Sequence, residues 1–140
     1  MFSGVSDGGT KGTARILVVD DDEIVLEYLS RLIGKAGYEV ITATSGEDAL
    51  IALQRDFAQI VIIDIIMPGM DGLALCRTIR RQTYSGYIYL MLHTSKTTDA
   101  DIQDGLAAGA DDYVGKGTSK DQMIERIHTA QRVLSLKRGL

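Results

Sequence analysis

Acidic residues and one lysine stand at positions where they could bind a divalent cation and a phosphoryl group. Asp20, Asp21 and Asp22 follow one short apolar run, Asp64 ends another, and Lys116 follows a third. Clustered carboxylates repel one another unless a cation or protons neutralise them. Oxygen ligands without histidine or thiolate favour Mg²⁺ (or Mn²⁺), which completes its coordination shell with water and phosphate. A carboxylate beside such a cation can attack phosphorus and form an acyl phosphate.

Each of these residue types suits a different role in such a reaction. Asp64, which precedes a Met-Pro turn, is the predicted nucleophile, and Asp20 and Asp21 are the predicted metal ligands. Lys116 suits a phosphoryl oxygen, because a lysine and a cation together stabilise charge on a transferring group. The hydroxyl of Thr94 could sense the product by hydrogen bonding to it. These residues are far apart in the sequence, so the hypothesis requires a fold that brings them together.

Short apolar runs that alternate with longer amphipathic stretches predict such a fold. The predicted strands and helices are, respectively, residues 15–19, 38–43, 60–64, 87–93 and 111–115, and residues 23–35, 46–55, 72–82, 98–108 and 120–136. This alternation implies an α/β fold, with a parallel sheet and helices on both of its faces. In open α/β sheets, sites lie at the carboxyl ends of the strands, which is where the acidic residues, Thr94 and Lys116 fall.

Length and composition predict one globular domain without a membrane segment. The chain has 140 residues, 45% of them hydrophobic and 24% charged, with a net charge of −4. This acidic balance argues against a nucleic-acid partner, and no apolar run approaches the roughly 18 residues that cross a bilayer. We therefore expect a cytoplasmic protein. Residues 1–14 are predicted to be a flexible leader, 15–136 the domain, and 137–140 a tail that could begin a linker to an output domain.

Several motifs resemble the receiver domain of two-component response regulators, including its chemotaxis members. They are ILVVDDDE (16–23), VIIDIIMPGMDG (61–72), the Thr94-Ser95 pair, GLAAGADDY (105–113) and Lys116. The resemblance covers about residues 14–136. It implies a flavodoxin-like (βα)5 three-layer sandwich whose five-stranded parallel sheet has the order 2-1-3-4-5.

The resemblance also implies a site and a reaction. Asp64 would accept a phosphoryl group from a sensor histidine kinase or a phosphotransfer protein. Asp21 and Asp64 would ligate Mg²⁺ with the backbone carbonyl of Ile66, and Asp20 would assist through a water molecule. Lys116 would contact the phosphoryl group. The protein would catalyse only its own phosphorylation and dephosphorylation, and so would not be an enzyme in the usual sense.

A conformational switch is implied as well. Thr94 would move toward the phosphoryl group, and Tyr113 would change rotamer with it. The face formed by the fourth helix, fifth strand and fifth helix would then change its partners. These would be an output domain or target protein, or a second copy in a homodimer.

Two positions depart from the family pattern. Lys116 is followed by Gly117 where the family has proline, so we expect a trans peptide bond there. His93 occupies a strand position that is usually aliphatic, and we expect it to be a buried or half-buried structural residue.

Three alternatives stay open at this stage. One is a haloacid-dehalogenase-like phosphatase that uses Asp20 and Asp22. Another is a degenerate receiver that only binds proteins. The third is an input domain separated from an output enzyme.

Cys76 lies among apolar residues, which favours a buried structural thiol over a nucleophile.

Overall fold

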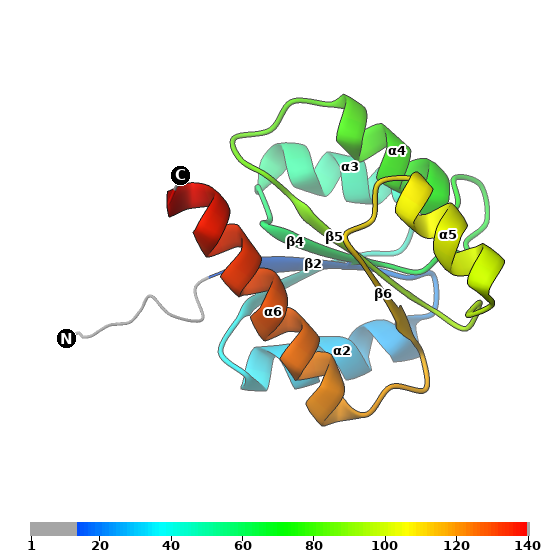
Figure 1. The fold of residues 1–140 in the computed structure, drawn as a ribbon, viewed down its shortest axis with the longest axis horizontal. Helices are drawn as coiled ribbons and strands as arrows, with labels where there is room; N and C mark the ends of the chain where they lie inside the picture. The colour runs from blue at the N-terminus through cyan, green and yellow to red at the C-terminus, as the bar shows by residue number, and fades with distance from the viewer. Residues whose placement is uncertain (1–13, 140) are drawn as a thin grey trace.

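One parallel sheet forms the centre of the molecule in the computed structural model, which describes residues 14–139 (Figure 1). Its strands are β2 (Arg15–Val19), β3 (Glu39–Ala43), β4 (Ile60–Ile63), β5 (Tyr89–Thr94) and β6 (Asp112–Gly115). They lie in the order β3-β2-β4-β5-β6, and all neighbouring pairs are parallel. Counted along the chain, this is the predicted order 2-1-3-4-5.

Helices cover both faces of the sheet. They are α2 (Glu23–Lys35), α3 (Gly46–Arg55), α4 (Gly72–Arg81), α5 (Asp99–Ala107) and α6 (Lys120–Gly139). In Figure 1, α2 and α6 lie on one face, and α3, α4 and α5 lie on the other. The predicted three-layer sandwich is therefore confirmed. No helix within residues 14–139 is both long enough and apolar enough to cross a membrane.

The central strands are buried on both sides. In β4, Val61 and Ile63 join the hydrophobic cluster under α3 and α4, whereas Ile60 and Ile62 join the cluster under α2 and α6. This division follows from the period-two geometry of a strand. Cys76 of α4 lies fully buried in the first cluster, and burial raises the pKa of its thiol to about 12. Cys76 is thus the inert core residue that its neighbours indicated.

β2, α2 and α3 have the predicted bounds, and the boundaries that differ do so by one to three residues. β4 ends at Ile63, so Asp64 stands just beyond the strand, and β5 runs to Thr94 rather than ending at residue 93. α6 continues to Gly139, three residues past its predicted end. The remaining shifts affect the starts of β3, β5 and β6, the end of α4 and both ends of α5. Most of the predicted leader lies outside the described residues, and the division into leader, domain and tail stays a prediction.

Side-chain caps set several helix starts. Ser45 accepts a hydrogen bond from the backbone N–H of Asp48 at the start of α3. Thr98 and Asp101 form a full capping box at α5, which explains why this helix begins one residue later than predicted. Gly37 has a φ of 101° just after α2, the left-handed position that glycine adopts without strain.

Candidate functional site

The carboxyl ends of four strands meet at one edge of the sheet. Asp20 follows β2, Asp64 follows β4, Thr94 ends β5 and Lys116 follows β6. Backbone hydrogen bonds extend the sheet pairing to these positions: the N–H of Asp64 donates to Val19 at 3.0 Å, and the N–H of Lys116 donates to Thr94 at 3.0 Å. The parallel sheet thus brings together side chains from distant parts of the sequence, as predicted.

Lys116 bridges two buried carboxylates. Its Nζ lies 3.0 Å from Oδ2 of Asp64 and 3.1 Å from Oδ2 of Asp20, and Asp20 is only 2% exposed. Burial raises the pKa of Asp20, and this outweighs the hydrogen bond from Asp22 and the ammonium of Lys116, which lower it. Burial alone would lower the pKa of Lys116, but its hydrogen bonds to Asp64 and Asp20 and their charges raise it overall. Lys116 is therefore a cation held in place by two anions.

Asp20, Asp21 and Asp64 form a cluster of oxygen donors. Each offers a carboxylate oxygen, and these oxygens lie within 4.8 Å of one another. Three carboxylates beside one lysine leave negative charge uncompensated, and a hard divalent cation such as Mg²⁺ would neutralise it. The chemistry of this donor set therefore suits the predicted cofactor.

Asp22 has a different task from its two neighbours. Its side chain accepts a hydrogen bond from the N–H of Ile24 and caps α2, and its own N–H donates to Oδ1 of Asp20 at 2.9 Å. The phosphatase alternative requires Asp20 and Asp22 to act as a catalytic pair, so the capping role of Asp22 argues against it.

The loop after β4 and the first residue of α4 both lie close to Asp64. The N–H of Ile66 donates to Oδ1 of Asp64 at 3.3 Å, while the Ile66 side chain is 55% exposed. Behind Asp64 lies Gly72, whose N–H donates to the carbonyl of Ile65 at 2.9 Å. A Cβ at Gly72 would lie 2.3 Å from the carbonyl oxygen of Asp64. Only glycine allows α4 to begin so close to the acidic residue, a role that the sequence analysis missed.

Thr94 and Tyr113 are linked through the backbone of Lys96. The hydroxyl of Thr94, which is fully buried, accepts a hydrogen bond from the N–H of Lys96 at 3.3 Å. The hydroxyl of Tyr113 donates to the carbonyl of the same residue. The ring of Tyr113 also packs against α5, where a Cβ at Gly105 would lie 2.9 Å from it. Hydrogen bonds thus join Tyr113 to Thr94 through the backbone of Lys96, a link that residue types in the sequence do not indicate.

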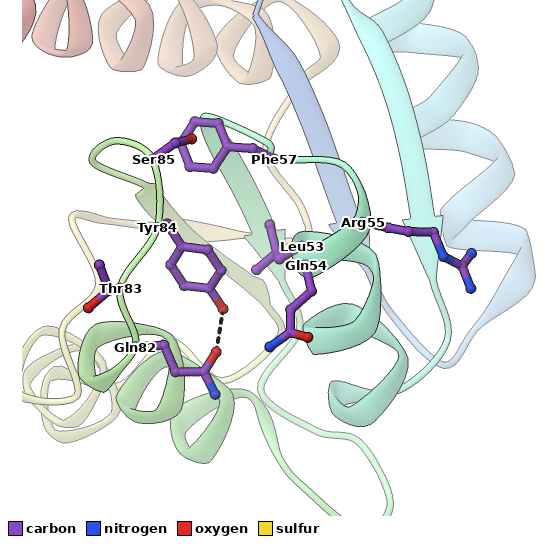
Figure 2. Close-up of a pocket in the computed structure, with 8 residues that line it drawn as sticks. All are labelled: Leu53, Gln54, Arg55, Phe57, Gln82, Thr83, Tyr84 and Ser85. Carbon is purple, nitrogen blue, oxygen red and sulfur yellow. Dashed lines mark hydrogen bonds between the residues drawn. The ribbon is translucent and has the colours of Figure 1, made fainter.

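A separate pocket of about 670 Å³ lies near the amino ends of β4 and β5, away from the acidic cluster. Its lining residues, shown in Figure 2, are Leu53, Gln54, Arg55, Phe57, Gln82, Thr83, Tyr84 and Ser85. They include no carboxylate, and the hydroxyl of Tyr84 is already bonded to the Gln82 side chain at 2.7 Å. The groups suited to phosphoryl chemistry lie at the other end of the sheet.

Replacing Asp20 with asparagine is expected to stabilise the metal-free protein. Because folding raises the pKa of Asp20, its ionised form costs stability at neutral pH, and this cost disappears as the pH falls below the ordinary value. Asparagine removes the charge and keeps an oxygen for the Asp22 N–H. A gain of about 1 kcal/mol would raise the Tm in EDTA by roughly 3–6 °C. The exposed Asp22→Asn, which retains its cap, is the matched control; a lower Tm for Asp20→Asn would contradict the prediction.

The comparisons with known proteins point to one family. The model for the response regulator receiver domain matches residues 16–128. The chain is 39% identical over 113 residues to the uncharacterized transcriptional regulatory protein YrkP of Bacillus subtilis, an alignment that covers 81% of this chain and 47% of YrkP. It is 36% identical over 118 residues to the alkaline phosphatase synthesis transcriptional regulatory protein PhoP of the same organism, covering 84% and 48%. The chain thus spans about half the length of these curated relatives.

Solved structures agree with the sequence matches. Chemotaxis protein CheY4 of Vibrio cholerae superposes with a TM-score of 0.80 at 28% identity, covering 84% of this chain and 98% of that one. The BeF3-activated N-terminal receiver domain of Klebsiella pneumoniae RstA gives a TM-score of 0.78 at 31% identity, with the same coverage. With its sheet order, its acidic cluster and these matches in agreement, the chain belongs to the response-regulator receiver domain family of two-component signalling.

Proposed function

We propose that Asp64 accepts a phosphoryl group and thereby switches the interactions of this receiver domain. The observation that carries the proposal is the position of its carboxylate, which is buried, bonded to Lys116 at 3.0 Å and clustered with Asp20 and Asp21. A carboxylate oxygen of Asp64 forms the new bond to phosphorus as the donor's leaving group departs with its electron pair. Apart from the phosphoryl donor the reaction needs no substrate, because the domain itself is the acceptor.

Asp20, Asp21 and Asp64 would hold a divalent cation, and the Ile66 carbonyl in the adjoining loop is proposed as a further ligand. Mg²⁺ in such a position would neutralise charge on the transferring group. Lys116 adds a second positive charge at the same carboxylate, and its raised pKa keeps it protonated at neutral pH. The low exposure of Asp64 restricts the approach of water to the product.

Thr94 and Tyr113 are the proposed relay from this site to the surface. In the present structure the Thr94 hydroxyl is bonded to the N–H of Lys96 and the Tyr113 hydroxyl to its carbonyl. A phosphoryl oxygen on Asp64 would offer the Thr94 hydroxyl a charged acceptor, which forms stronger hydrogen bonds than a neutral one. A movement of Thr94 would pull the Lys96 loop and change the position of Tyr113 against α5.

Partners of the domain follow from the same proposal. The phosphoryl donor would be a sensor histidine kinase or a phosphotransfer protein. The relatives are named transcriptional regulators, so the recipient of the signal would be an output domain or target protein that responds to the α5–β6–α6 face. A homodimer through this face stays a prediction.

Peptide mapping after incubation with a small phosphodonor would test the proposed function. We expect one phosphoryl adduct, formed with Mg²⁺ and absent in EDTA. Borohydride reduction converts an aspartyl phosphate to homoserine, which should appear at position 64 in the mapped peptide. An adduct on another residue would overturn the assignment. No adduct and no Mg²⁺ binding would favour the degenerate receiver, and donor turnover without an adduct would favour a phosphatase.

A further inference from the structure

His93 is a buried polar residue beside the site, and the proposed reaction does not use it. It precedes Thr94 in β5 and is only 6% exposed. It lines a small pocket of about 100 Å³ together with Leu29 of α2, Met123 of α6 and Lys116. Burial, with a smaller effect of the nearby Lys116 charge, lowers the pKa of His93 to about 4, so the ring is neutral at pH 7.

The turn that carries Lys116 has little restraint of its own. It follows β6 and is closed by a hydrogen bond of 3.0 Å from the N–H of Thr118 to the carbonyl of Gly115. Gly117, at its centre, has no atom within 4 Å of the position that a Cβ would take. Glycine has more backbone freedom than any other residue, so Gly117 is the most flexible position of the turn. Lys116 itself is anchored at both ends, because its N–H donates to the Thr94 carbonyl and its Nζ lies between two carboxylates. Restraint of the Lys116 stem between these anchors falls to the side chains beside it.

The structure assigns this task to His93, which we propose is a positioning residue for Lys116. The neutral His93 lines the same pocket as Lys116 and Thr118, which belong to the turn. A side chain of this bulk limits how far the Lys116 stem can sink toward α2 and α6, and a neutral ring does not repel the ammonium group. The inference rests on the proposed function, because it assigns Lys116 to phosphoryl transfer.

A double-substitution experiment tests this inference. His93→Ala removes the wall and should slow phosphoryl incorporation from a small donor about tenfold, since small misplacements of a catalytic group have effects of this order or larger. Gly117→Ala, which the open space allows, should restore part of the rate by restricting the turn. Met91→Ala is the matched core control. Met91 lies on the same strand and face as His93 but pairs with Asp112, so this variant should leave the rate of phosphoryl incorporation into the folded protein unchanged.

NMR relaxation of the Lys116 and Thr118 amides, without donor or metal, provides a readout that is independent of phosphorylation. We expect greater mobility in His93→Ala and reduced mobility in the double variant. Slower phosphorylation with unchanged amide mobility and no rescue by Gly117→Ala would overturn the inference, as would an unchanged rate. If His93→Ala does not fold, His93→Val creates a smaller cavity for the same measurements. If the wild type takes no phosphoryl group, the proposed function fails, and the amide mobility alone decides the role of His93.

Discussion

Replacing Asp64 with asparagine is expected to abolish phosphoryl incorporation at this site. An amide oxygen is a far weaker nucleophile than a carboxylate, and the substitution also removes a charge that the proposed cation would neutralise. The fold should survive, because asparagine is isosteric and its oxygen can still accept the hydrogen bond from Lys116, now at 3.0 Å from Oδ2. Intact-mass spectrometry after incubation with donor and Mg²⁺ should show the adduct in the wild type only.

Asp71→Asn is the matched control for this experiment. Asp71 lies in the same loop, is exposed and caps α4 by accepting the N–H of Ala74 at 2.8 Å. Asparagine caps helices as well as aspartate does, so this variant should be phosphorylated like the wild type. An adduct of equal yield in Asp64→Asn would place the acceptor elsewhere and refute the assignment.

Gly72→Ala is expected to destabilise the protein strongly and to disturb Asp64. The added Cβ would lie 2.3 Å from the carbonyl oxygen of Asp64 and 2.7 Å from Cα of Ile65, and neither backbone atom can move without shifting the loop. Overpacking of this kind lowers the free energy of unfolding by about 3 kcal/mol, and the Tm should fall by roughly 10 °C. The rate of phosphorylation should fall in the fraction that stays folded.

Gly34→Ala provides the comparison within the same chain. Gly34 is exposed in α2, and its Cβ would meet nothing within 4 Å. Alanine there should raise the free energy of unfolding by up to about 1 kcal/mol, because it favours the helix. Thermal unfolding of both variants, followed by circular dichroism, measures the difference. Equal stability of the two variants would contradict the prediction, because it would mean that the loop after β4 can move away from the added Cβ at little cost in free energy.

The sequence was sufficient to predict the sheet and the acidic part of the site. Fully apolar runs such as residues 60–63 indicated strands buried on both faces, and the rule for parallel sheets placed Asp20, Asp64 and Lys116 at a common edge. Hydrogen bonds of Lys116 to both carboxylates now confirm that proximity. The strand order came from the family resemblance, since periodicity alone cannot order parallel strands.

Contacts between backbone segments could not be predicted in this way. Gly72 was recognised only as the start of a helix, because its closeness to Asp64 depends on how α4 packs. The link from Thr94 to Tyr113 runs through backbone atoms of Lys96, and such atoms leave no trace in residue type. Asp22 is an aspartate like Asp20 and Asp21, but its position immediately before α2 makes it the N-cap of that helix.

The burial of Cys76 has a practical consequence for spectroscopy. Because this is the only cysteine in the chain and its thiol is shielded and protonated, thiol-specific reagents should leave the folded protein unmodified at neutral pH. A cysteine introduced at the exposed Leu106 of α5 could then be labelled selectively with a fluorophore or spin probe. The natural sequence is already a suitable background for following movement of α5 in real time, without any prior removal of native thiols.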